Sequence, residues 1–164
     1  MQKSELYSGT IADNIRWGKE DATDEEVIAA AKIAQADDFI CNTTYGYYTL
    51  VTEGGHSLSG GQKQRAAIAR MLTQDVPIMI FDDSLSAVDT ETDAKIRQAI
   101  SQRFGKASVI LISHRITTLS AADKIIVLDG GRIVEEGTHD TLKSAGGIYQ
   151  KIFEAQSGIQ EVNL

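Results

Sequence analysis

The chain has 164 residues, 42% of them hydrophobic and 24% charged, which is the size and balance of one globular domain with a buried core. Its formal net charge of −7 argues against a general nucleic-acid surface, where a basic stripe is expected. The longest apolar runs are far shorter than the roughly 20 residues that cross a bilayer. The single Cys41 cannot form an internal disulfide, so a reducing, cytosolic setting fits.

The first half of the chain predicts helices. Segment 23–35 begins with Thr23 and Glu26 in the register of a capping box. Its apolar residues then share one helical face: Val27, Ile28, Ala31 and Ala34. The following residues, 41–57, are rich in glycine and other turn formers and predict a loop or a short irregular stretch.

The stretch LSGGQKQRAAIARML, residues 58–72, predicts a helix with a bare beginning. Ser59 can cap this helix, and Gly60 and Gly61 add no side chain that would keep an anion away from the backbone N–H groups. Three apolar residues recur at helical spacing and three basic residues are free to face elsewhere: Ile68, Met71 and Leu72, and Lys63, Arg65 and Arg70. An anion docked at the start of the helix is the functional hypothesis, and an ordinary capped helix is the alternative.

From residue 77 the pattern changes to short apolar runs separated by helical segments, which is typical of a parallel sheet. The runs are PIMIF at 77–81, SVILIS at 108–113 and KIIVLD at 124–129. A helix is predicted over 90–104, capped by Thr90 with Asp93 three residues later. Its buried face is expected to hold Ile96, Ile100 and Phe104.

The end of the chain predicts a hairpin followed by a helix. The run KIIVLD turns at Asp129, Gly130 and Gly131 into RIVEEG, which favours a β-hairpin. A last amphipathic helix is expected around Tyr149, Ile152 and Phe153.

Polar side chains follow two of the apolar runs at the point where each predicted strand ends. Asp82 and Asp83 come directly after the first run, and His114 follows the second. Ligands in open α/β sheets bind outside the carboxyl ends of the strands, so these residues are candidates for a nucleotide site. For the two aspartates, a structural turn or a generic metal site is the alternative interpretation. For the histidine, the alternative is a cap of the next helix.

Together these residues resemble the ATP-binding cassette (ABC) ATPases. LSGGQ at 58–62 is similar to the signature motif of that family, PIMIFD at 77–82 to its Walker B strand, SAVD at 86–89 to its D-loop, and His114 to its switch histidine. The stretches SGTIADNIRWG at 8–18, VTEGGHSLSGG at 51–61 and GGRIVEEGTHDTLKSAGGIYQKIFE at 130–154 resemble cassettes of multidrug-type exporters. Four motifs in the order and spacing of the family make this resemblance specific.

The resemblance implies an α/β fold: a P-loop NTPase-like parallel sheet with flanking helices, plus the helical subdomain of ABC proteins. Residues 1–157 would form a partial nucleotide-binding domain, with a helical and signature part at about 10–75, a Walker B to C-terminal RecA-like part at 76–157, and a tail at 158–164. The phosphate loop G-x-x-x-x-G-K-[ST] is absent from the sequence, so the chain is expected to be the C-terminal portion of a cassette.

The resemblance also implies roles for single residues, with ATP and Mg²⁺ as the bound groups. Asp83 and His114 would be catalytic. Nucleotide contacts would come from Ser59, Gly60, Gly61, Gln62, Gln2 and Asp89. Asp82 and Gln2 would hold Mg²⁺, through water. Glu53, Gly54 and Gly55 would face the coupling helices of the membrane domain. Taken alone, residues 53–57 indicate only a flexible loop, and Gln2 is an ordinary residue near a terminus.

Position 83 departs from the family pattern, because the family has a catalytic glutamate where this sequence has Asp83. A general base must come within about 2.6–3.2 Å of the water that it orients. Aspartate is shorter than glutamate by one methylene, roughly 1.5 Å. Slow turnover at the chain's own site is therefore expected, with an intact signature motif that completes the site of a partner.

In the family, two cassettes close head to tail, so the resemblance implies a second cassette as partner, which is expected to be a different chain. It also implies the transmembrane domain of an exporter as partner, which places the chain at the cytoplasmic face of a membrane. A homodimer that tolerates aspartate is the alternative to the heterodimer. A non-catalytic ATP-dependent clamp or regulatory module is the alternative to the exporter. A DNA-repair type of cassette would need coiled-coil heptads between its motifs, and the sequence has none.

Overall fold

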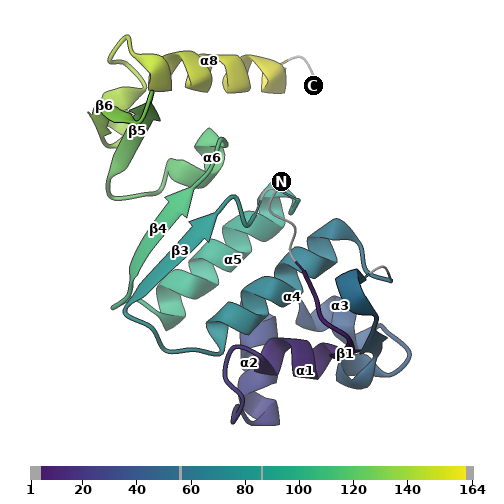
Figure 1. The fold of residues 1–164 in the computed structure, drawn as a ribbon. Coiled ribbons are helices and arrows are strands. Elements are labelled where there is room, and N and C mark those ends of the chain that lie inside the picture. The colour runs from purple at the N-terminus through teal and green to yellow at the C-terminus, as the bar shows by residue number, and fades with distance from the viewer. Residues whose placement is uncertain (1–4, 56, 86, 162–164) are drawn as a thin grey trace. The chain divides into compact units, whose positions relative to one another are not determined.

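The computed structural model describes residues 5–55, 57–85 and 87–161 (Figure 1). Contacts within the chain divide it into two compact units, Met1–Ile110 and Leu111–Leu164. The mixed α/β class that the sequence predicts is confirmed, with sheets that are each two strands wide in the described part of the chain. Within the same residues, no helix combines the length and the apolar character that a membrane crossing requires.

The first unit begins with a helical part. Its helices are α1 (Ile11–Arg16), α2 (Asp24–Ile33), α3 (Asp37–Cys41) and α4 (Gly60–Leu72), with 3-10 turns η1 (Gly46–Tyr48) and η2 (Glu53–Gly55). Strands β1 (Gly9–Thr10) and β2 (Leu50–Val51) pair antiparallel. β2 and both 3-10 turns lie in the stretch predicted to be loop, where the local sequence carries too little periodicity to reveal a two-residue strand.

Helix α2 forms as the sequence predicts. The Thr23 side chain accepts a hydrogen bond from the Glu26 N–H, and the Glu26 carboxylate accepts one from the Thr23 N–H. These two bonds complete the capping box. Val27, Ala31 and Ala34 are buried, and Ile28 is half-buried. This buried face contacts α4, which also packs against α1.

Arg65 and Arg70, expected only to face elsewhere than the apolar side of their helix, contact neighbouring turns of the fold. Arg65 donates from Nη1 to the Gln35 carbonyl at 2.7 Å, and its guanidinium lies 5.0 Å from the centre of the Phe39 ring. Arg70 donates from Nε to the Asn14 carbonyl at 2.8 Å. Helix α4 has neighbours on more than one side, so both arginines bury their stems and satisfy carbonyl groups of adjacent turns.

Strands β3 (Ile78–Asp82) and β4 (Ser108–Ile112) lie side by side and run in the same direction, with α5 (Thr90–Arg103) between them in the chain (Figure 1). Continuous apolar runs of this kind are typical of strands that are buried on both faces. Burial instead alternates along β3: Met79 and Phe81 are buried, whereas Ile78 and Ile80 are 58% and 61% exposed. Successive strand side chains point to opposite faces, so one face of β3 is covered and the other is left apolar and open.

The cap of α5 also differs from the prediction. Asp89, with extended backbone, accepts a hydrogen bond from the Thr92 N–H at 2.9 Å, and Thr90 is already helical. Both residues are good caps, so sequence alone could not decide between neighbours. Asp93, expected to serve the cap, is instead buried and forms an ion pair with Arg97 at 3.1 Å. Ile96, Ile100 and Phe104 are buried, as predicted.

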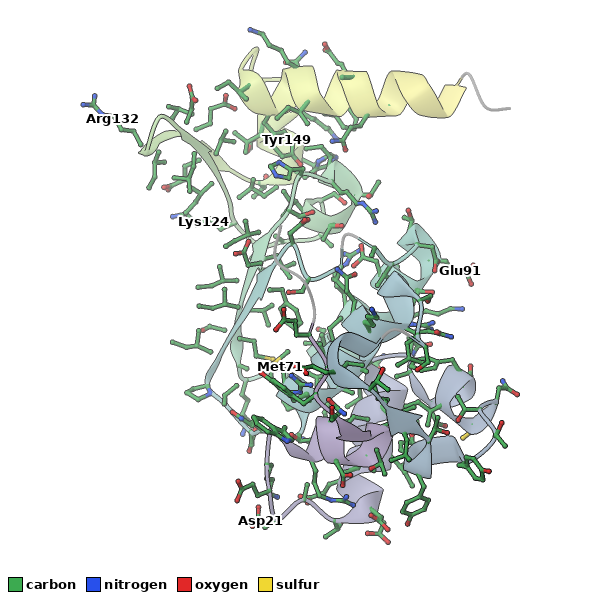
Figure 2. The ribbon with its side chains drawn as sticks, turned by 45° about the vertical axis from the view of Figure 1, so that its right-hand side comes forward. Asp21, Met71, Glu91, Lys124, Arg132 and Tyr149 are labelled. Atoms are coloured by element: carbon green, nitrogen blue, oxygen red, sulfur yellow. The ribbon has the colours of Figure 1, made fainter. Side chains whose placement is uncertain are left out.

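The second unit contains the predicted hairpin, β5 (Ile125–Asp129) paired antiparallel with β6 (Arg132–Gly137). Gly130 and Gly131 have φ of 54° and 75°, which suits the tight turn, and Arg132 stands at its tip (Figure 2). Helices α6 (Ile116–Leu119), α7 (His139–Leu142) and α8 (Ile148–Glu161) complete the unit. Its core contains Ile116, Ile125, Leu142 and Tyr149, with Phe153 packed against them.

Two details of α8 differ from what its sequence suggests. Ile152, placed on the apolar face with Tyr149 and Phe153, is 40% exposed. The helix also runs on to Glu161, into the residues expected to begin a tail at 158.

The capping box of α2 gives a direct test of local structure. Thr23→Ala removes the acceptor for the Glu26 N–H and should lower the free energy of unfolding by about 1 kcal/mol. Thr23→Asn, which supplies another good capping oxygen, should stay close to the wild type. Urea denaturation of the three proteins measures this, and equal stability of the alanine variant and the wild type would contradict a working cap.

Candidate functional site

The start of α4 is shaped by a second capping box. The Ser59 side chain accepts a hydrogen bond from the Gln62 N–H at 3.3 Å, and the Gln62 side-chain oxygen accepts one from the Ser59 N–H at 2.9 Å. The predicted cap is therefore confirmed, and Gln62 is part of it. These bonds fix the first turn, and helix geometry leaves the N–H groups of Gly60 and Gly61 without intrahelical acceptors.

The positive end of α4 is not neutralised by an acidic residue of its own first turn. Helix α2, by contrast, carries Asp24, Glu25 and Glu26 there. Helix α8 has no acid in its first turn either, but the Glu135 carboxylate accepts hydrogen bonds from its Ile148 and Tyr149 N–H groups. Partial positive charge and N–H groups without intrahelical partners together favour an external anion at the exposed start of α4.

The two glycines of this turn have different roles. A Cβ on Gly61 would lie 2.9 Å from the Ala87 carbonyl oxygen, so Gly61 is needed for close packing. Among the described residues, a Cβ on Gly60 would meet only the Ala87 side chain, at 3.9 Å, and Gly60 is exposed. The Gln64 side chain accepts a hydrogen bond from the Ala87 N–H at 2.9 Å and strengthens the same contact. Gly60 alone therefore keeps open space at the helix start.

This packing brings residues 59–62 close to residues 87–89, the segment that ends at Asp89. The carboxylate of Asp89 is engaged as the cap of α5, and its hydrogen bond from Thr92 lowers the pKa of Asp89 below the usual value. Because this pKa is lowered, the hydrogen bond to the Asp89 carboxylate stabilises the folded state above the unfolded-state pKa. This stabilisation is lost as the pH falls through the folded-state pKa. Asp89 thus positions the end of this segment.

Asp82 and Asp83 lie at the carboxyl end of β3, as predicted, and both are exposed. Asp83 has φ of +48°, a left-handed conformation that aspartate tolerates better than most residues. Strained backbone of this kind is frequent at functional sites. The described residues contain no group of three acidic, histidine or cysteine side chains that could hold a metal by themselves. Mg²⁺ is commonly bound by one or two carboxylates together with phosphates, so Asp82 is a suitable ligand.

Residues 53–55 are held against the beginning of the described chain. Gly54 and Gly55 have φ of 76° and 61°, and the Gly54 N–H donates to the Leu6 carbonyl at 3.0 Å. Glu53 is exposed, whereas Gly55 is buried, with Leu6 and the Lys63 side chain as its neighbours. The turn is thus ordered beside α4, and its single charged side chain faces outward.

His114 belongs to the second unit, where it is exposed after β4. Gln156 on α8 donates from Nε2 to the His114 carbonyl at 2.7 Å and accepts from the Ile116 N–H at 2.9 Å. Gln156 therefore fixes the backbone on both sides of Arg115. No sequence signal indicated it, because a glutamine on an amphipathic helix looks like any surface residue. Gln2 lies outside the described residues.

The division of roles between the two glycines can be tested by stability. Gly61→Ala forces a methyl group against the Ala87 carbonyl and should lower the free energy of unfolding by about 1–3 kcal/mol. Gly60→Ala meets no such contact and should change it by no more than about 0.5 kcal/mol. Urea denaturation of both variants decides the point, and equal losses would show that the contact with Ala87 does not distinguish them.

Comparisons with known proteins agree with these features. A family model described as "ABC transporter" matches residues 1–86. The chain is 47% identical over 155 residues to an uncharacterized ABC transporter ATP-binding protein of Sinorhizobium fredii, which covers 94% of this chain and 26% of that protein. It is 44% identical over 157 residues to a Staphylococcus aureus protein named "Putative multidrug export ATP-binding/permease protein", covering 96% of this chain and 27% of that one.

A solved structure of a bacterial Atm1-family ABC exporter with ATP bound matches the fold with a TM-score of 0.89 at 42% identity, covering 94% of this chain and 27% of that chain. The chain thus spans about a quarter of the length of the relatives that it matches, 26% in the first case. The motifs, the geometry and these matches agree: the chain belongs to the ABC transporter family.

Proposed function

We propose that this chain is the C-terminal part of an exporter's nucleotide-binding domain, of the multidrug type, and that it couples ATP binding and hydrolysis to export across a membrane. The open start of α4, beside the segment that ends at Asp89, is the observation that carries the proposal. The match to an Atm1-family exporter with ATP bound supports ATP as the ligand. The match to the multidrug export protein of Staphylococcus aureus supports export as the type of transport.

The open face of β3 and β4 supports a place within a larger cassette. Ile78 and Ile80 share one face of β3 and are 58% and 61% exposed, and Ile110 and Ile112 share one face of β4 and are 48% and 52% exposed. Apolar strand faces of this kind are normally buried against further strands or helices. The missing phosphate loop belongs to the same proposed remainder, so the 164-residue chain by itself is expected to be inactive. Residues of about 10–75 would be the helical subdomain, and 76–157 the RecA-like part.

In this proposal the bound group at the start of α4 is the γ-phosphate of an ATP held by a second cassette. The N–H groups of Gly60 and Gly61 would stabilise negative charge, while Ser59 and Gln62 keep the turn in shape. Positioning and charge stabilisation supply most of the catalysis in phosphoryl transfer, so a fixed helix start is a catalytic contribution.

The other proposed roles concern the chain's own nucleotide. Asp82 would hold Mg²⁺, which supplies charge neutralisation of the phosphates when bound, and Gln2 would contact the same ion shell through water. His114 would contact the γ-phosphate or the attacking water, with its backbone held by Gln156. Asp83 would orient the water weakly, because its carboxylate ends about one bond short of a glutamate's.

The proposal therefore includes asymmetry. This chain would complete a competent site on a different partner cassette, and its own site would turn over slowly. Glu53, Gly54 and Gly55 would face the transmembrane domain, which puts the chain at the cytoplasmic face of a membrane. The exposed Glu53 carboxylate on an ordered turn is suited to such a contact.

A non-catalytic clamp, which closes on ATP without turnover, is the second candidate, and the aspartate at position 83 is the observation that favours it. The two candidates differ in ATPase activity of the full-length protein. Steady hydrolysis by the assembled protein supports the exporter motor. Nucleotide-driven closure without hydrolysis, in the presence of any second cassette, supports the clamp.

The asymmetric exporter is tested by two variants of the full-length, assembled transporter. Gly60→Val blocks the approach of phosphate to the helix start and should lower ATPase turnover by a factor on the order of 10²–10³, as loss of one preorganised donor does elsewhere. Asp83→Asn should change turnover little, because the site that it serves is already slow. A steady-state ATPase assay measures both.

Gly158→Val is the matched control, because Gly158 lies on α8, outside the proposed site, and a Cβ there would meet none of the described residues within 4 Å. This variant should keep wild-type turnover. If Asp83→Asn removed activity as fully as Gly60→Val, Asp83 would be a working base, and a symmetric pair of cassettes would replace the asymmetric one.

A further inference from the structure

Arg70 lies in the last turn of α4, at the opposite end from Ser59. Its guanidinium donates from Nε to the Asn14 carbonyl at 2.8 Å, from Nη2 to Asn14 Oδ1 at 3.1 Å, and from Nη1 to the Glu5 carbonyl at 3.3 Å. Arginine is suited to this because its planar fork reaches several acceptors at once. One side chain of α4 thus joins α1 and the segment that leads into it.

Asn14, which is almost fully buried, continues the connection to Tyr7. Its Oδ1 accepts from the Tyr7 N–H at 2.8 Å, and its Nδ2 donates to the Tyr7 carbonyl at 2.8 Å. The Tyr7 ring lies 5.1 Å below the Arg70 guanidinium and stacks on Trp17 with ring centres 4.4 Å apart. Trp17 itself is 63% exposed. The connection from Arg70 therefore ends at an aromatic surface.

A second junction joins the same two helices just after Trp17. A Cβ on Gly18 would lie 1.9 Å from the Arg70 carbonyl oxygen, so the two backbones are in direct contact. The Gln74 side chain donates to the Gly18 carbonyl at 2.5 Å. The end of α1 is thus held to the end of α4 both by packing and by hydrogen bonds.

We propose that Arg70 is a positioning residue that makes α1 and α4 move as one body, so that anion binding at residues 59–61 is transmitted to the surface formed by Tyr7 and Trp17. Helix α4 has 13 residues and is about 20 Å long, so it connects two distant places. The inference rests on the proposed nucleotide contact at the start of α4 and adds a coupling function to its other end.

Arg65 provides a matched control on the same helix. Its guanidinium also donates to a carbonyl, that of Gln35, and lies over an aromatic ring, that of Phe39 at 5.0 Å. Its contacts lead to residues 35–39 and, within α4, from Nε to the Gly61 carbonyl at 3.4 Å, and none of these contacts is to α1. Loss of either arginine fork removes similar interactions, so an effect on α1 that is specific to Arg70 separates coupling from simple loss of stability.

Hydrogen exchange with mass spectrometry, on the full-length protein assembled with its second cassette, tests the proposal. Mg²⁺ with the non-hydrolysable analogue AMP-PNP is the probe. In the wild type, nucleotide should slow exchange at residues 59–63 and, by about fivefold or more, at residues 11–18. In Arg70→Lys the effect at 59–63 should remain and the effect at 11–18 should be lost. Arg65→Lys should keep both effects.

Three outcomes would overturn the coupling. Nucleotide could protect residues 59–63 of the wild type and leave 11–18 unchanged, which needs no variant and so does not depend on variant folding. Arg70→Lys could retain the nucleotide effect at 11–18, or Arg65→Lys could lose it equally. Absence of any nucleotide effect at 59–63 in the wild type would remove the proposed function itself, and the inference with it.

Discussion

The candidate site depends on a helix whose positive end is left open. The capping box of Ser59 and Gln62 fixes the first turn of α4, yet no carboxylate of that turn neutralises it. An open helix start attracts anions, because its N–H groups lack intrahelical partners and the helix dipole adds partial positive charge. The proposed contact with phosphate requires nothing from α4 beyond this turn and the space kept by Gly60.

Position matters as much as charge, and tertiary contacts set the position of the turn. At its start, Gly61 and Gln64 hold α4 to Ala87, next to the cap of α5. At its end, Arg70 holds it to α1. A helix fixed at both ends cannot tilt freely, and the proposed coupling between its two ends rests on this.

Local features could be predicted from the sequence, because their determinants are a few residues apart. The caps at Thr23 and Ser59, the hairpin at Gly130 and Gly131, and the strand that ends at Asp82 are all of this kind. The choice between Asp89 and Thr90 as a cap failed although it is local, since both residues suit the role.

Features that depend on distant partners could not be predicted. Gly61 looks identical to Gly60 until the Ala87 backbone is in place, and Arg70 looks like a surface residue until Asn14 is beside it. Gln156 gave no signal at all, because its partners are about forty residues away in the chain, near His114. The apolar run of β3 gave no sign that Ile78 and Ile80 are exposed while Met79 and Phe81 are buried, because all four residues are equally suited to a covered face.

The contact between the start of α4 and phosphate is the central claim, and a structure of the full-length protein with its second cassette, Mg²⁺ and AMP-PNP tests it most directly. The measured quantity is the distance from the amide nitrogens of Gly60 and Gly61 to the γ-phosphate oxygens of the nucleotide held by the second cassette. The account predicts hydrogen-bond distances of about 2.7–3.2 Å for at least one of them. A closed dimer in which this turn faces solvent or contacts no phosphate would contradict it.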